Sequence, residues 1–117
     1  MTTITELNKI NEILKKYEGG YAKIWAFKLS LNRLFIRLTL IGYEEVVYIV
    51  AVSCEHMIGP FSWKNAKLSI VKETDKENSE VIFYAIDIEA GFKLTASGGL
   101  ILACGSEKEF EDYFAQQ

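Results

Sequence analysis

The stretch EVVYIVAVSC, residues 45–54, decides the fold that this sequence predicts. In an extended chain, successive side chains point to opposite faces, so the segment splits into two rows. One row holds Val46, Tyr48, Val50 and Val52, and the other holds Val47, Ile49 and Ala51. Both rows are apolar, which is typical of a strand at the centre of a sheet that is covered on both sides. We therefore expect residues 45–54 to form a central, doubly covered strand.

Six further segments have the composition of strands. They are rich in β-branched, aromatic and leucine residues, and turn-forming residues separate them: 21–31, 33–41, 66–72, 81–88, 92–96 and 100–104. No connection between them is long enough for a crossover helix, so neighbouring strands should be mostly antiparallel. We expect a polar hairpin loop from Lys72 to Glu80 and a turn at Gly42.

A helix is expected at each end of the chain. Residues 3–17 carry an apolar stripe at helical spacing. Thr3 and Glu6 have the spacing of a capping box at the start of this helix. Ser106 and Glu109 repeat that spacing before a short aromatic segment, which predicts a second helix docked on the sheet.

The order of these elements predicts the fold class α+β in a single domain, residues 1–117. An N-terminal helix precedes a six- to seven-stranded, mostly antiparallel sheet, and a short C-terminal helix follows it. Two forms of the sheet stay open. It is either an open sheet with a helix on one face, or a strongly curled sheet that approaches a small barrel plugged by the C-terminal helix.

The alternation of apolar residues predicts the pairing of the first two strands. A two-residue turn at Asn32-Arg33 would place Trp25 and Phe27 on a wholly apolar face, opposite Leu38 and its neighbours. The turn lacks glycine, so a longer loop is the alternative.

Two turns near the C-terminus are predicted in the same way. A three-residue loop that ends at Gly91 would set Asp87 directly opposite Lys93. The next turn, at 97–99, would pair the strands on either side of it and give both of them one apolar face.

Charge and hydropathy argue against several classes of partner. The chain has 117 residues, a net charge of −3 and no long run of lysine and arginine, so we expect no nucleic-acid partner. The longest apolar stretch, Val46 to Val52, is far too short to span a bilayer, and we expect no membrane partner. The N-terminus is too polar for a signal peptide, which predicts a soluble, cytoplasmic protein with reduced cysteines.

The segment CEHMIGPFSW, residues 54–63, holds the most reactive residue types in the chain. Cys54 and the single histidine, His56, would share a strand face and could reach one metal ion, or His56 could act as a base for Cys54 or Cys104. Zinc needs at least a third ligand, and no second Cys/His cluster exists in the sequence. Gly59-Pro60 cannot continue a central strand. We therefore expect a corner between two strands, with no metal, no cofactor and no catalytic residue.

Charged residues of the sheet suggest one alternative function. A cleft lined by Lys28, Arg37 and Lys93 would receive an anion, with Asp87 and Thr95 orienting it. The protein would then be a small-ligand binder or an enzyme. Asp87 also has a simpler explanation, as the ion-pair partner of Lys93 across a hairpin.

The second face of the sheet leads to the main hypothesis. Once a helix covers the first face, the second face retains Phe35, Ile41, Phe83 and Ile101. Monomers rarely expose continuous apolar patches larger than a few hundred Å², so we expect these residues to pair with a second copy or with another protein. The sequence thus predicts a non-enzymatic interaction protein that forms a homodimer. A dedicated inhibitor of another protein is a third possibility, motivated by the acidic charge and small size.

Overall fold

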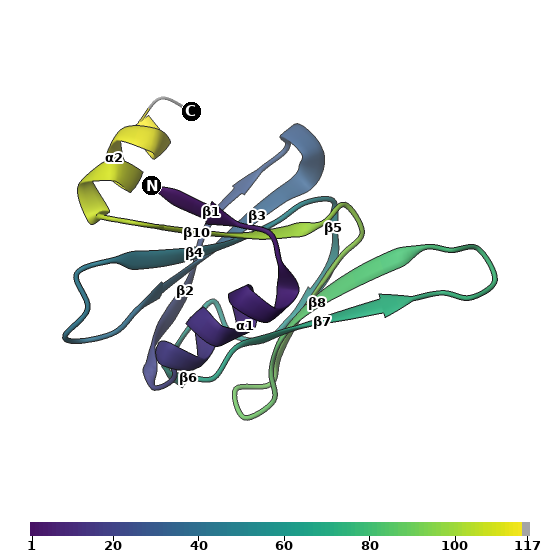
Figure 1. The fold of residues 1–117 in the computed structure, drawn as a ribbon, viewed down its shortest axis with the longest axis horizontal. Helices are drawn as coiled ribbons and strands as arrows, with labels where there is room; N and C mark the ends of the chain where they lie inside the picture. Colours follow the sequence, from purple (N-terminus) through teal and green to yellow (C-terminus); the bar gives the residue numbers. More distant parts are fainter. Residues whose placement is uncertain (116–117) are drawn as a thin grey trace.

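The computed structural model describes residues 1–115, which form ten strands, two α-helices and one short 3-10 helix (Figure 1). In chain order the elements are β1 (Thr2–Ile4), α1 (Leu7–Lys16), β2 (Gly20–Lys28), η1 (Ser30–Asn32), β3 (Arg33–Thr39), β4 (Val46–Ala51), β5 (Cys54–Ile58), β6 (Ser62–Ala66), β7 (Ser69–Thr74), β8 (Val81–Asp87), β9 (Phe92–Ala96), β10 (Leu100–Gly105) and α2 (Glu107–Ala115). Six strands form one antiparallel sheet in the order β1-β10-β4-β3-β2-β6, and four form a second in the order β5-β9-β8-β7. The predicted α+β class, with a helix near each end, is confirmed.

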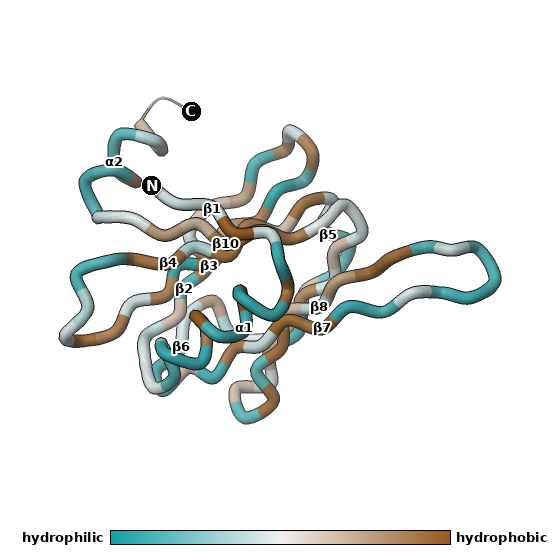
Figure 2. Tube along the Cα trace, in the orientation of Figure 1, coloured by the Kyte–Doolittle hydropathy of each residue, from teal (hydrophilic) through white to brown (hydrophobic). Residues whose placement is uncertain are grey.

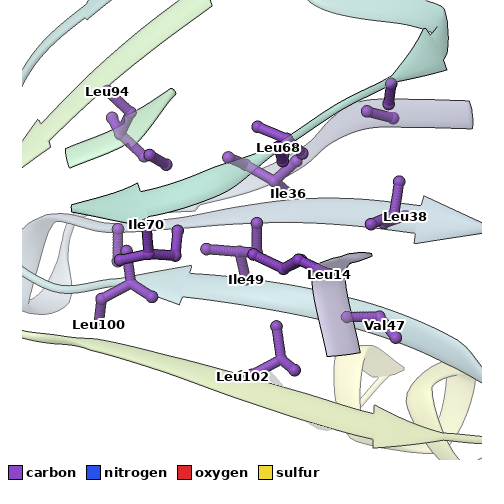
Figure 3. Close-up of a cluster of buried hydrophobic side chains, with 14 of the residues drawn as sticks. Leu14, Ile36, Leu38, Val47, Ile49, Leu68, Ile70, Leu94, Leu100 and Leu102 are labelled. Atoms are coloured by element: carbon purple, nitrogen blue, oxygen red, sulfur yellow. The ribbon is translucent and has the colours of Figure 1, made fainter. Parts of the chain in front are cut away.

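β4 is the central, doubly covered strand that its sequence predicts. All six of its residues are buried. Val47 and Ile49 point into the main core, beside Leu14 of α1 (Figure 3). Tyr48 and Val50 point the other way, into a second cluster on the outer face of the six-stranded sheet. The two α-helices therefore pack on opposite faces of this sheet.

The main core lies between the two sheets, and α1 closes it. Ile36 and Leu102 come from the six-stranded sheet and Leu94 from the four-stranded one (Figure 3). The Asn11 side chain of α1 bonds both backbone groups of Ile70 in the edge strand β7. It accepts from the N–H at 2.8 Å and donates to the carbonyl at 3.0 Å. Helix α1 thus satisfies part of a sheet edge that would otherwise be open.

The two sheets are joined by one sharply bent ladder. β4 pairs with β10 as far as Ala51 opposite Leu100, and β5 resumes the pairing with Cys54 opposite Ala96. Backbone bonds carry the ladder around the bend, and Ser53 there has a φ of 56°. The predicted strand 45–54 therefore ends at Ala51, which is one reason why the strands outnumber the six or seven expected.

The predicted pairing across the turn at 97–99 is wrong. β9 lies in the four-stranded sheet and β10 in the six-stranded one, so the two strands do not face each other. Gly98 and Gly99 instead form the second half of the bend, where Gly98 N–H donates to the Val52 carbonyl at 2.9 Å. The bend resembles the strongly curled form left open by the sequence, but the expected plug is wrong: α1 lies against the core between the two sheets, and the C-terminal helix α2 covers the outer face.

The N-terminal helix is shorter than the predicted 3–17. Thr2–Ile4 is a strand that pairs with the end of β10, and Thr3 lies opposite Ala103. Helix α1 starts at Leu7, and the side chain of its N-cap residue, Glu6, makes no capping hydrogen bond, so the predicted capping box of Thr3 and Glu6 is absent. Within residues 1–115, neither helix has the length and apolar character needed to cross a membrane.

The predicted register of the first hairpin is wrong, and the longer loop is what forms. β2 pairs with β3 so that Phe27 lies opposite Leu34, with a bulge between Ile24 and Ala26. The 3-10 helix η1 occupies the turn. Trp25 and Phe27, which the two-residue turn would bury, are therefore exposed.

The predicted register of the β8–β9 hairpin is also wrong, by one residue. Asp87 lies opposite Phe92, and Lys93 lies opposite Ile86. The loop has four residues, 88–91, because the Asp87 carboxylate accepts the N–H of Ala90 at 3.2 Å. A shift of one residue moves a side chain to the other face, so Asp87 turns into the interior.

The segment 54–63 forms the corner that its sequence predicts. β5 ends at Ile58, Gly59 has a φ of 131°, and β6 starts at Ser62 in the other sheet. A Cβ on Gly59 would lie 2.8 Å from the Cα of Phe92. The glycine is therefore required both by its left-handed backbone and by the close approach of β9.

We predict that Gly59→Ala lowers the free energy of unfolding by about 3 kcal/mol, because a left-handed alanine is strained and its methyl group collides with backbone. Urea denaturation measures the change. Gly42→Ala is the matched control: Gly42 has a φ of 97°, but a Cβ at this position would meet no atom within 4 Å beyond its neighbours in the chain. It should lose only about 1 kcal/mol. Equal losses in the two variants would contradict the steric part of this explanation.

Candidate functional site

An aromatic cluster joins α2 to the outer face of the six-stranded sheet. Phe35 of β3 and Tyr48 of β4 pack against the underside of α2. The ring centroids of Tyr48 and Phe110 are 4.3 Å apart, and those of Phe35 and Phe114 are 5.3 Å apart in an edge-to-face arrangement. Such pairs add about 1 kcal/mol each beyond the area they bury. They fix the position of this short helix.

Polar contacts at the start of α2 complete its attachment. Ser106 and Glu109 form the predicted capping box, in which each residue bonds the backbone N–H of the other, at 3.2 and 3.1 Å. Glu109 also pairs with the N-terminal ammonium group, and this contact lowers the pKa of its carboxyl group. Glu107 pairs with Arg37 of β3. The helix therefore joins the N-terminus to the outer face of the sheet.

Arg37 links α2 to the part of the outer face that α2 leaves open. Its guanidinium carbon lies 4.6 Å from the ring centroid of Trp25, a cation–π distance. Its Nε is buried and has no hydrogen-bond partner among the described residues. Trp25 in turn meets Tyr48 edge to face, with centroids 6.2 Å apart. A depression between β2 and α2 is lined by Trp25, Arg37, Tyr48, Glu107, Phe110, Glu111, Phe114 and Ala115.

A second hollow lies under α2 on the side of β1 and β10. Its volume is about 160 Å³, and its lining is mostly apolar, including Phe35, Val50, Ile101 and Phe114. Pockets for drug-sized ligands usually measure about 300 to 1,000 Å³. This hollow is thus better explained as incomplete packing beneath a short helix than as a ligand cavity.

The structure does not gather the residues predicted to bind an anion. Lys28 and Arg37 lie on β2 and β3 of one sheet, whereas Lys93 and Thr95 lie on β9 of the other. Lys93 Nζ stands 4.5 Å from the ring centroid of Tyr84. Asp87 is buried and turned away from solvent. Of this set, Arg37 alone lines a depression on the outer face.

The four predicted interface residues are likewise divided. Phe35 is only 2% exposed because α2 covers it, and Ile101 is half-buried beside the same helix. Ile41 is fully exposed in the loop before β4. Phe83, on β8 of the other sheet, packs partly against the main core. The face expected to be free is therefore partly covered within the same chain.

Asp87 instead forms a buried polar centre that no sequence pattern indicated. Its carboxylate is 1% exposed and accepts hydrogen bonds from Trp63 Nε1 at 2.8 Å and from the Lys67 N–H at 2.7 Å, besides the bond from Ala90. Three donors satisfy the charge without a cation. The predicted ion pair with Lys93 is thus replaced by bonds that tie β6 and the segment between β6 and β7 to β8.

The cysteines and the histidine form no reactive group with one another. His56 is exposed on β5, and a bulge separates its pairing from that of Cys54. Cys104 lies on β10, in the other sheet. Burial raises the pKa of both thiols, which makes them poorer nucleophiles. Among residues 1–115, no three side chains of the His, Cys, Asp and Glu types come close enough to hold a metal ion.

Comparison of the chain with protein-family models, with curated proteins and with solved structures gives no match. The outer face beside α2 is therefore the candidate site on its own geometry. Arg37 was among the predicted anion-binding residues, but two features of this face were not predicted: the outward position of Trp25 at a bulge, and the ion pair of Arg37 with Glu107. The excess of Lys and Arg over Asp and Glu around Trp25 was the signal that could have drawn attention to them.

We predict that the protein loses stability above about pH 10 and that Tyr48 is a main cause. Burial raises the pKa of Tyr48 from 10.0 to about 12, although the charge of Arg37 opposes this rise. The folded state therefore favours the neutral phenol, and its stabilising effect is present below pH 10 and lost as the pH rises towards 12. Urea midpoints at several alkaline pH values measure the slope.

Tyr48→Phe should flatten this slope, because no phenol then titrates at the buried position. The matched control is Val50→Ala, which alters the same buried cluster without removing a titratable group and should leave the slope as it is. An unchanged slope in Tyr48→Phe would contradict the assignment.

We also predict that Asp87→Ala lowers the free energy of unfolding by about 3 kcal/mol or more, because buried donors lose their acceptor. Chemical denaturation measures the loss. Asp75→Ala is the control, since Asp75 is exposed and its carboxylate accepts a hydrogen bond from the nearby Glu77 N–H, at 2.9 Å. That variant should change stability by less than about 1 kcal/mol. Similar losses in both variants would show that Asp87 is not the polar centre described above.

Proposed function

We propose that this protein is a non-enzymatic interaction protein that self-associates through the open part of the outer face. The observation that supports the proposal is a patch of Tyr21, Lys23, Trp25 and Arg37 beside α2. Tyr21 and Trp25 are each 41% exposed, and Lys23 Nζ lies 5.9 Å from the Trp25 ring centroid. Aromatic residues and arginine are the types enriched at protein interfaces.

The charge of the chain supports a second copy as the partner. Residues 19–43, which hold the patch, contain four basic and no acidic residues, whereas the rest of the chain carries a net charge of −7. Helix α2 places Glu107 and Glu111 at the depression beside the patch. A twofold axis would bring the patch of each copy onto the acidic helix of the other, so that both contacts are complementary.

The proposal includes a cytoplasmic location. Cys54 and Cys104 are both free thiols, as is usual in a reducing compartment. The proposed interface differs from the one expected from the sequence, because Phe35 and Ile101 already pack in the cluster under α2. The centre of the contact moves to Trp25.

A small anionic ligand at the same depression is the second candidate function. The buried Nε of Arg37, which lacks a hydrogen-bond partner among the described residues, supports it. It ranks second because Glu107 already pairs with this guanidinium and would compete with an anion.

We predict a dimeric mass at tens of micromolar protein in light scattering behind a sizing column. Trp25→Glu should yield a monomer and raise the dissociation constant about 100-fold or more, because an interface centre of this type carries much of the binding energy. The variant should still fold, because a glutamate at this exposed position would lie beside the positive charges of Lys23 and Arg37. Circular dichroism checks that the variant is folded.

Val71→Glu is the control, because Val71 is 40% exposed on β7 of the other sheet. That variant should remain a dimer. A monomeric wild-type protein, or a Trp25→Glu variant that stays dimeric, would contradict the proposed interface.

A further inference from the structure

The tip of the β2–β3 hairpin, Phe27–Arg33, exposes large apolar side chains outside the patch that forms the proposed dimer. Leu29 is 84% exposed and Leu31 is 67% exposed, and Phe27 precedes them at about half exposure. The loop stands at the upper edge of the molecule (Figure 1). Hydrophobic and hydrophilic residues follow one another along it (Figure 2). A leucine at such a position adds nothing to the core.

The backbone holds this tip in one strained shape. Leu31 has a φ of 59° and Asn32 a φ of 44°, a left-handed conformation that a bulky residue such as leucine rarely adopts. The Leu31 carbonyl accepts the N–H of Ser53 at 2.9 Å, and the Leu29 carbonyl accepts the N–H of Asn32 at 3.1 Å. The first bond fixes the loop to the bend between the two sheets, and the second closes the loop on itself. Strain of this kind is found most often at functional sites.

Two cations stand at the base of the tip, at the same level. Lys28 and Arg33 are opposite each other in the β2–β3 ladder, so Leu29 and Leu31 lie beyond both of them. Arg33 Nε donates to the Ser30 carbonyl at 3.3 Å, which holds its side chain beside the loop. No acidic residue occurs anywhere from 19 to 43. The tip is therefore apolar at its end and positive at its base.

We propose that this tip inserts into the headgroup region of an anionic lipid bilayer. A planar negative surface can meet Lys28 and Arg33 together while the two leucines reach the more apolar layer beneath. Juxtamembrane cations of this kind are attracted by the acidic lipids of the cytoplasmic leaflet. A projecting loop tip encloses no ligand, which disfavours a small molecule as the occupant. This proposal departs from the expectation of no membrane partner, which was argued from the lack of a spanning segment, because a peripheral contact needs no such segment.

The test is co-sedimentation of the full chain with lipid vesicles. One set contains phosphatidylcholine alone, and the other contains phosphatidylcholine with about 30% phosphatidylserine. We expect binding to the second set and little to the first, with a loss of binding as salt is added. The double variant Leu29→Ser, Leu31→Ser should lower the vesicle-bound to free ratio at least about tenfold. Lys28→Gln should lower binding to the anionic set.

Matched controls make these results specific to the tip. Ile88→Ser removes an apolar side chain that is 87% exposed, in the loop after β8, and it should bind as the wild type does. Lys72→Gln removes an exposed charge on β7 and should have a weaker effect than Lys28→Gln. Melting curves check that every variant is folded. Failure to bind anionic vesicles, or equal binding by the double leucine variant and the wild type, would overturn the proposal.

The lipid contact is independent of the proposed dimer. Trp25→Glu lies off the tip, so a folded, monomeric Trp25→Glu variant should still sediment with anionic vesicles. If neither wild type nor this variant binds vesicles while the wild type is a dimer, the lipid proposal fails and the dimer stands. If the wild type is a monomer and binds anionic vesicles, the dimer proposal fails and the lipid proposal stands.

Discussion

The bent ladder between residues 46–58 and 93–105 is the constraint on which the rest of the structure depends. Its two halves pair in different sheets, and backbone hydrogen bonds at Val52, Ser53, Gly98 and Gly99 continue through the bend. The bend folds one long hairpin into two layers, and the apolar rows of both layers then face the same interior. Helix α1 fills the remaining side and bonds the edge of β7. No metal or disulfide is needed to hold such a core together.

The same bend explains why the protein has a second, outer cluster. β4 is apolar on both faces, so bending the sheet around one row leaves Tyr48 and Val50 outside. A nine-residue helix, α2, covers them and is shorter than the sheet is wide. It sits over β3, β4 and β10 and leaves β2 open, where Trp25 and its cations gather. The candidate site is thus a consequence of covering a wide sheet with a short helix.

Much of the fold follows from the sequence because its strongest signals are long and local. The doubly apolar β4, the capping box of Ser106 and Glu109, and the corner at Gly59-Pro60 are all found where the sequence places them. These features depend on residue type and spacing over a few positions. Each is stabilised by nearby groups, so no knowledge of the tertiary fold is required.

The errors arise where a single distant contact decides between two registers. Asp87 takes the interior position because Trp63 and Lys67 supply donors from another part of the chain, and alternation alone favours an apolar residue there. A bulge beside Trp25 turns a tryptophan outward, although its type suggests the core. Thr2–Ile4 becomes a strand because β10, about a hundred residues later, offers a free edge. The placement of the candidate site depends on these contacts, and for this reason it was the least predictable part.

The pairing of β1 with β10 also has a consequence for how the chain folds as it is made. Thr2 lies opposite Cys104, and the N-terminal ammonium group meets Glu109, so the first strand cannot pair until about a hundred further residues have been synthesised. β4 likewise receives its neighbour β10 late. Contacts of such large sequence separation slow folding, because the chain entropy is lost before the pairing is gained. On the ribosome the six-stranded sheet is thus completed only after β10 has been synthesised, and the apolar outer face of β4 stays uncovered until α2 follows it.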